Sequence, residues 1–306
     1  MARLTLTFLG TSAAAPTKAR GLPAMVLQRE GELVILDSGE GVQRQFASLG
    51  LGLNRETTIL ITHLHGDHVA GLPGLLWTMA LAQRTRPLTL VAPAALKEWL
   101  DSTAKVLHLG LTFPLRFVSA RRGRVLRLPA FDVLAERASH SIECFSYVIQ
   151  EKTRPGVFYP ERARRLGVPE GRLWSRLQKG RSATVEGRTV RPSEVTGPPR
   201  PGRRVGYSGD TRPSKALARF FRHCDLLVFD STYTNADSAK AVEFKHSTST
   251  EAARLAERAG VRRLLLTHFS ARYQSTSALV REARAVFPAT IAARDGMEIE
   301  VDYPVS

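Results

Sequence analysis

Residues 62–68 contain four side chains of the kinds that bind metal ions in proteins. Three histidines and one aspartate fall within six residues: His63, His65, Asp67 and His68. Imidazole nitrogens and carboxylate oxygens are the usual ligands of Zn²⁺ and related divalent ions. A lone histidine would be explained better as an ordinary polar loop residue, but four ligand-type side chains in so short a stretch favour a metal site.

A buried strand is predicted to hold this cluster in place. Residues 57–61 are β-branched and apolar, which is typical of a buried strand. The first two histidines are separated by one residue, so an extended backbone would point both imidazoles to the same side. The last two ligands are expected to begin a helix that runs through residues 69–79.

Three more candidate ligands lie where predicted strands end. Each follows its strand by a few residues: His140, Asp210 and His268. In α/β proteins, sites gather at the carboxyl ends of strands. We therefore expect four loops, distant in the sequence, to form one pocket.

Strand-like and helix-like segments alternate along the rest of the chain. Strands are predicted at 3–9, 24–28, 33–37, 88–92, 115–118, 124–128, 131–135, 142–149, 204–207, 225–229, 261–266, near 290 and at 297–301. Helices are predicted at 42–49, 72–82, 97–106, 160–166, 171–178, 250–259 and 275–286. This order indicates an α/β fold with two sheets packed face to face and helices outside. No linker divides the core, so we expect a single domain over residues 1–306.

The composition favours a polyanionic partner. The net charge is +16 and the pI is near 10.7, which suits nucleic acid first and an acidic membrane surface second. The alternative is that the charge only aids solubility or follows from genome composition. The two cysteines have no metal-type spacing and form no disulfide framework. With neither a signal-peptide pattern nor an apolar run that could span a membrane, we expect a cytoplasmic protein.

Residues 150–204 differ from the flanking sequence in charge and in glycine and proline content. They contain 14 basic and 5 acidic residues, so their charge of +9 is more than half of the net charge. Glycine and proline recur, and few residues can bury apolar surface. We therefore expect an inserted, protruding and mobile basic arm. It could be a solvated insertion without a partner, but concentrated arginine favours nucleic-acid binding.

The order of ligands in residues 63–68 resembles the HxHxDH signature of the metallo-β-lactamase fold, which many hydrolases share. The chain as a whole resembles the ribonuclease Z family, whose members remove the 3′ trailer of precursor tRNA. Residues 16–21 resemble the family's PxKxRN loop, which reads the 3′ CCA end, although Gly21 stands where that loop ends in asparagine. His246 and the two residues after it resemble the family's HST motif, and the basic insert resembles its tRNA-binding arm.

This resemblance implies a four-layer αβ/βα sandwich that holds two zinc ions, with Mn²⁺ or another divalent ion possible. His63, His65 and His140 would hold one metal, Asp67, His68 and His268 would hold the other, and Asp210 would bridge both. Asp230 would orient His246. The residues expected to contact tRNA are Lys18, Arg20, Arg162, Arg164, Arg165, Arg172, Arg176 and Lys179. The family also implies a homodimer in which the arm of one subunit holds tRNA for the active site of the other.

The chemistry expected of such a site is hydrolysis of a phosphodiester. Two divalent ions can activate a water and stabilise both oxygens of an in-line displacement at phosphorus. Asp67 could accept the proton of the nucleophile, and His246 could protonate the leaving oxygen. The main alternative is a small-molecule phosphodiesterase on the same scaffold. An RNA-binding protein with structural zinc fits less well, because structural sites are usually closed and rich in cysteine. The missing signal peptide disfavours a β-lactam hydrolase.

Overall fold

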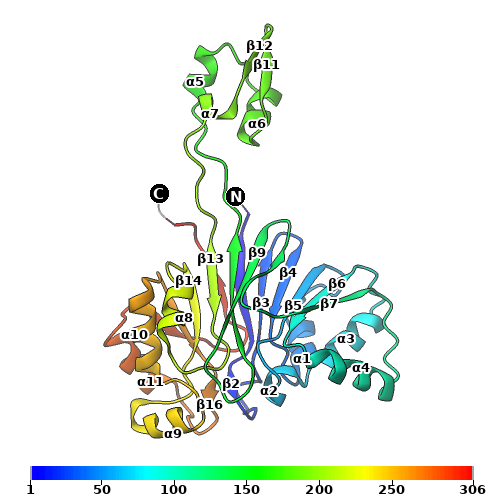
Figure 1. The fold of residues 1–306 in the computed structure, drawn as a ribbon, viewed down its shortest axis with the longest axis vertical. Coiled ribbons are helices and arrows are strands. Elements are labelled where there is room, and N and C mark those ends of the chain that lie inside the picture. The colour runs from blue at the N-terminus through cyan, green and yellow to red at the C-terminus, as the bar shows by residue number, and fades with distance from the viewer. Residues whose placement is uncertain (1, 305–306) are drawn as a thin grey trace. The chain divides into compact units, whose positions relative to one another are not determined.

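The computed structural model describes residues 2–304, and its largest unit is built on two seven-stranded sheets (Figure 1). The first sheet has the order β18 (Glu298–Glu300), β1 (Leu4–Gly10), β3 (Ala24–Arg29), β4 (Glu32–Leu36), β5 (Glu56–Leu60), β6 (Leu88–Ala92) and β7 (Leu115–Ser119). Its strands are antiparallel from β18 to β4 and parallel from β4 to β7.

The second sheet has the order β17 (Thr290–Ala292), β15 (Leu264–Thr267), β14 (Leu226–Asp230), β13 (Arg204–Tyr207), β10 (Phe145–Glu151), β9 (Phe131–Arg137) and β8 (Gly123–Arg127). The four strands from β17 to β13 are parallel, while β13 and β10 are antiparallel. Each sheet therefore contains a run of parallel strands whose carboxyl ends can supply loops to a shared site.

Three apolar clusters define the layers. The central cluster joins the two sheets, because alternate residues of β3 and β4 such as Met25 and Val34 pack with Phe145 and Val228 of the second sheet. Residues on the opposite face of the first sheet pack against α1 (Val42–Ser48), α3 (Leu72–Leu81) and α4 (Leu96–Val106). The second sheet packs against α8 (Lys215–Phe220), α10 (Ser249–Ala259) and α11 (Ser277–Arg284). The predicted αβ/βα sandwich is confirmed.

Both faces of the central strands are buried. All seven residues of β1 are buried, and so are four of the five residues of β4. Side chains of a strand alternate between its two faces, so a strand that lies between another sheet and a helix layer is mostly apolar, with small polar residues such as Thr5 and Thr7 of β1 at a few positions.

Some elements were not predicted from the sequence. They are the paired short strands β2 (Ser12–Ala13) and β16 (Phe269–Ser270), the hairpin of β11 (Ala183–Val185) and β12 (Arg188–Val190), and the short helices α7 (Pro192–Val195), η1 (Asn235–Asp237) and α9 (Ser238–Glu243). Each is brief and lacks a clear periodicity. No helix of residues 2–304 is long and apolar enough to cross a membrane.

The helix predicted over residues 69–79 is wrong at its start, because the chain forms α2 (Gly66–Val69) and then α3 with a break between them. The backbone N–H of Gly71 donates to Ser38 O at 2.9 Å instead of to a carbonyl of its own helix. A Cβ on Gly71 would lie 2.0 Å from Gly39 O, so only glycine allows this approach. At this break, the hydrogen bond from Gly71 to Ser38 holds the end of α2 against the loop that follows β4.

Residues 151–203, together with Tyr303 and Pro304, form a second unit. It contains α5 (Pro160–Arg165), α6 (Arg172–Gln178), α7 and the β11–β12 hairpin. The expectation that this segment buries little apolar surface is wrong. Its small core consists of Ala163, Val168, Leu177, Ala183, Val190 and Val195, with Trp174 and Phe158 packed against them.

Candidate metal centre

The structure brings all seven predicted ligands together in one place. His63, His65, Asp67 and His68 follow β5, and the other ligands follow β9, β13 and β15 of the second sheet. The atoms fall into groups that could each hold an ion: His63, His65, His140 and Asp210 form one, and Asp67, His68 and His268 form another. Parallel strands from both sheets thus deliver their carboxyl ends to a shared cleft.

The first group places three imidazole nitrogens side by side. Nδ1 of His65 lies 3.0 Å from Nε2 of His63 and 3.1 Å from Nε2 of His140. Oδ2 of Asp210 completes the set at 3.5 Å from His63 Nε2 and 3.9 Å from His140 Nε2. All four atoms point to a common centre.

The second group is held by the other oxygen of the same aspartate. Oδ1 of Asp210 lies 3.3 Å from His68 Nε2 and 3.4 Å from His268 Nε2. The two imidazole nitrogens are 3.3 Å apart, and Oδ2 of Asp67 lies 3.6 and 3.4 Å from them. Asp210 therefore faces one group with each of its carboxylate oxygens.

These side chains fit a pair of divalent ions. Ligands about 2.0–2.1 Å from a tetrahedral ion lie about 3.3 Å from one another, and most of the separations above are close to that value. Oδ1 of Asp210 is buried, and no residue of the part of the chain that the structure describes donates a hydrogen bond to it. A buried carboxylate oxygen without a partner is costly, and a cation between Asp210, His68 and His268 would satisfy it. Donors of nitrogen and oxygen without sulfur suit Zn²⁺ or Mn²⁺.

A buried aspartate after β4 orients two of the histidines. Oδ2 of Asp37 lies 2.8 Å from His68 Nδ1, so the imidazole presents Nε2 to the second group. The hydroxyl of Thr62 donates to Asp37 and lies 3.0 Å from Nδ1 of His63. Tyr207 donates its hydroxyl to the same Asp37 oxygen at 2.8 Å. Partners of this kind fix the tautomer and the direction of a metal-binding histidine.

A second buried aspartate, at the end of β14, repeats this arrangement. Oδ2 of Asp230 lies 3.0 Å from Nδ1 of His246. The hydroxyl of Thr232 donates to Oδ1 of Asp230 at 2.7 Å and lies 2.8 Å from Nδ1 of His268. Each aspartate thus holds one histidine directly and a second through a threonine.

Burial and neighbouring charges shift the pKa values of the site histidines in opposite directions. Burial lowers the pKa of His63, and it does the same more mildly for His65 and His140. A neutral imidazole is the form that binds a metal. In contrast, the carboxylates of Asp210 and Asp37 outweigh burial and raise the pKa of His68. Against the effect of its own burial, neighbouring histidines hold the pKa of Asp210 well below its usual range.

His246 lies at the edge of the same cleft. Its ring centroid is 5.1 Å from those of both His140 and His268. Burial works against protonation, but the Asp230 carboxylate raises the pKa of His246 to about 9. The cleft, of about 580 Å³, is lined by His65, Asp67, Asp210, His268, Tyr233 and Phe244 among others. It leaves room for a substrate beside the ligand atoms.

The residues predicted to contact tRNA differ in their exposure and in whether they already bind another residue of the chain. Lys18 is exposed, but Arg20 is partly buried and donates to the carbonyl of Tyr273 at 2.5 Å. All six candidates in the second unit are exposed: Arg162, Arg164, Arg165, Arg172, Arg176 and Lys179. Of these, Arg164 pairs with Glu161 and with Glu170.

Sequence reasoning missed the residues that support the ligands. Asp37 was expected in a turn near the floor of the site or, alternatively, as a simple turn or helix-capping residue, and Thr62 and Thr232 were given no role. The signal was available for Asp37, because it follows a predicted strand as the other site residues do. For the threonines no pattern exists, since their partners come from distant parts of the chain.

We expect Asp37→Asn to weaken metal binding by about 10–100-fold, the usual cost of removing such a supporting partner. Asparagine keeps the shape of the side chain and tolerates the positive φ of +59° at this position, but it cannot accept every bond that the carboxylate does. Metal content after equilibration with a chelator of known affinity measures the effect. Asp225→Asn is the control, because Asp225 is also buried and accepts a backbone N–H, from Arg204, but at the start of β14. Equal metal affinity in both variants would contradict the role of Asp37.

Comparison with known proteins is consistent with this geometry. Two family models match parts of the chain, the anti-Pycsar protein Apyc1 over residues 4–112 and the beta-lactamase superfamily domain over residues 194–269. The metallo-beta-lactamase fold protein YhfI from Bacillus subtilis is similar in structure, with a TM-score of 0.71 at 17% identity over 98% of this chain and all of that one. At this identity the likeness concerns the fold.

Closer similarity extends over nearly the whole chain. Ribonuclease Z of Nitrosopumilus maritimus is 45% identical over 97% of this chain and 99% of its own length. Ribonuclease Z of Salinibacter ruber is 43% identical over 96% of this chain and 93% of its own. The crystal structure of human tRNase Z, short form, is similar with a TM-score of 0.71 at 28% identity, covering 97% of this chain and 99% of that one. The chain belongs to the ribonuclease Z family.

Proposed function

We propose that this member of the ribonuclease Z family cuts precursor tRNA with the aid of two divalent ions, zinc by preference, held by the seven candidate ligands described above. It removes the 3′ trailer and leaves a 3′-hydroxyl on the tRNA and a 5′-phosphate on the trailer. The observation that carries the proposal is the position of Asp210, whose two oxygens face separate groups of candidate ligands and whose Oδ1 has no hydrogen-bond partner among residues 2–304. The full-length similarity to proteins named ribonuclease Z supports the same substrate.

His63, His65 and His140 would hold one ion, Asp67, His68 and His268 the other, and Asp210 would bridge them. Two ions so placed supply a water with a lowered pKa and positive charge for the oxygens of the phosphate. The remaining residues position the substrate and move protons. The supporting pairs of Asp37 with His68 and Asp230 with His246 keep these side chains in place before substrate binds.

Two residues would carry the proton transfers. Asp67 would accept the proton of the attacking water, since its carboxylate lies in the cleft and its Oδ2 is held by the backbone N–H of Ala14 at 2.8 Å. The water oxygen bonds to phosphorus while the bond from phosphorus to O3′ breaks. His246 would donate a proton to O3′, because Asp230 holds its Nδ1 and no protein group among residues 2–304 occupies its Nε2.

A small-molecule phosphodiesterase is the less favoured reading. Such an enzyme would need the metal ligands but not a basic insert with a core of its own. Here residues 151–203 bury six apolar residues and still leave six candidate cations exposed. Clustered exposed cations are what binding to an RNA backbone requires. We propose that this unit binds tRNA, that the chain acts as a homodimer, and that it works in the cytoplasm.

The purified protein should cut one precursor tRNA at a single place, directly after the nucleotide that becomes the tRNA 3′ end. Mapping the ends of both products checks the position and the placement of the phosphate. A chelator should abolish the cut and added Zn²⁺ should restore it. Asp210→Ala should lose both metal ions and activity. Cleavage by a variant without metal, or the absence of any cut by the metal-loaded protein, would overturn the proposal.

His246→Ala should lower kcat on precursor tRNA by about 10²–10⁴-fold at saturating substrate, the usual contribution of a general acid. Metal content should not change. A small diester whose leaving group needs no proton should be hydrolysed nearly as fast as by the unaltered protein. The control is His108→Asn, since His108 is exposed and far along the chain from the site. Equal losses of kcat on both substrates would rule out proton donation.

The second unit can be removed with little strain. Arg154 and Arg200 exchange backbone hydrogen bonds of 2.8 and 2.9 Å, so a two-residue Asn-Gly turn can replace residues 155–199. We expect the shortened chain to cut precursor tRNA poorly and a small diester normally. Mixing it with Asp210→Ala should restore tRNA cleavage, because one chain then supplies the site and the other the basic unit. If mixing restores nothing although mixed dimers form, action across subunits is excluded.

A further inference from the structure

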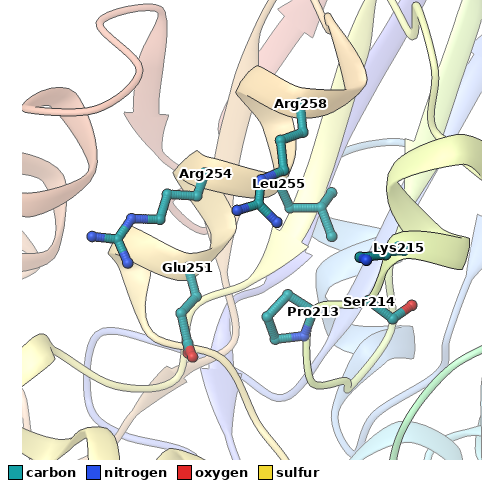
Figure 2. A pocket seen from close by; sticks show the side chains of 7 residues that line it. All are labelled: Pro213, Ser214, Lys215, Glu251, Arg254, Leu255 and Arg258. Atoms are coloured by element: carbon teal, nitrogen blue, oxygen red, sulfur yellow. The ribbon is translucent and has the colours of Figure 1, made fainter.

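A basic cleft lies between α8 and α10, outside the metal centre (Figure 2). It measures about 290 Å³ and is lined by Pro213, Ser214, Lys215, Glu251, Arg254, Leu255 and Arg258. The first three residues lead into α8, and the other four lie along α10. Nothing in the proposed reaction uses these cations.

The lining of the cleft has three basic side chains and one acidic side chain. Lys215, Arg254 and Arg258 are exposed, and none has an ion pair or hydrogen bond to another residue in the described part of the chain. Glu251, the only acid in the lining, already pairs with Arg212. The two arginines are four residues apart on one helix face, where like charges repel. A bound anion would relieve this repulsion.

Figure 2 shows how the cations are directed. Arg258 extends from α10, and Lys215 extends from α8 on the other side, into the same space. Arg254 lies one turn before Arg258, about 6 Å along the helix axis. Several long, flexible cations spread along an open cleft suit a chain of phosphates, because each can neutralise a different phosphate.

The side chain of Arg212 connects the cleft to His246, the proposed proton donor. Arg212 donates to the carbonyl oxygen of His246 at 2.6 Å and to Oε2 of Glu251 at 2.7 Å. His246 faces the metal ligands, whereas Glu251 lines the cleft. The cleft therefore lies on the His246 side of the metal centre, and the Arg212–Glu251 pair stands between the two.

We propose that this cleft binds backbone phosphates of the acceptor stem of the tRNA. The proposal rests on the proposed function, in which His246 protonates O3′ of the nucleotide that stays on the tRNA. RNA on the side of His246 is then the tRNA body, and the trailer leaves on the side of the attacking water. The cleft adds a binding surface that belongs to the catalytic unit and is separate from the basic insert.

The test compares two triple variants with the same decrease in charge. One carries Lys215→Gln, Arg254→Gln and Arg258→Gln. The control carries Lys105→Gln, Arg116→Gln and Arg121→Gln, three exposed cations of the first unit whose side chains form no ion pair or hydrogen bond with another described residue. For each, kcat/KM on precursor tRNA is divided by kcat/KM on a small diester, which corrects for any change in folding or metal content.

We expect the ratio to fall at least tenfold for the cleft variant and less than twofold for the control. The slope of log Kd against log salt concentration should become shallower by about 0.9 for each phosphate that the variant no longer neutralises. The defect should be the same for trailers of one and of twenty nucleotides. Matching ratios and slopes in the two variants would overturn the proposal, and so would a defect that appears only with the long trailer. Since the unaltered protein is measured in the same assay, failure of the cleft is distinguishable from failure of the proposed function.

Discussion

The site depends on one buried carboxylate that serves two groups of ligands. Asp210 follows β13 near the middle of the second sheet, and each of its oxygens faces imidazoles from a different group. A buried carboxylate without partners is expensive, so the folded chain can keep Asp210 ionised there only if positive charge surrounds it. Bound cations would meet that need and would couple the stability of this part of the fold to metal binding.

Two further buried aspartates determine where the histidines point. Asp37 follows β4 in the first sheet, and Asp230 ends β14 in the second; each holds one histidine directly and a second through a threonine. The two sheets thus make equivalent contributions from the ends of parallel strands. The packing of their shared apolar core determines the separation of these aspartates and therefore the geometry of the ligands.

Exposed cations gather in two places, which belong to different units of the chain. Residues 151–203 carry many exposed cations on a small apolar core of their own. The first unit holds a second set in the cleft between α8 and α10, joined to the proposed proton donor through Arg212. A long substrate such as tRNA can use both, because phosphate contacts add along a backbone.

By itself the sequence indicated the candidate ligands, the strand ends that hold them and the layered fold, because side chains of metal-binding types and apolar periodicity are local signals. His246 was assigned through the resemblance of its motif to that of the ribonuclease Z family, and the basic insert through its charge and its glycine and proline content. Only the tertiary structure decided that Asp37 orients His68 and that Arg20 is bound to a backbone carbonyl. It also decided that the helix after residue 65 breaks at Gly71 and that the insert has a core. These features depend on contacts between residues far apart in the chain, which no short stretch of sequence encodes.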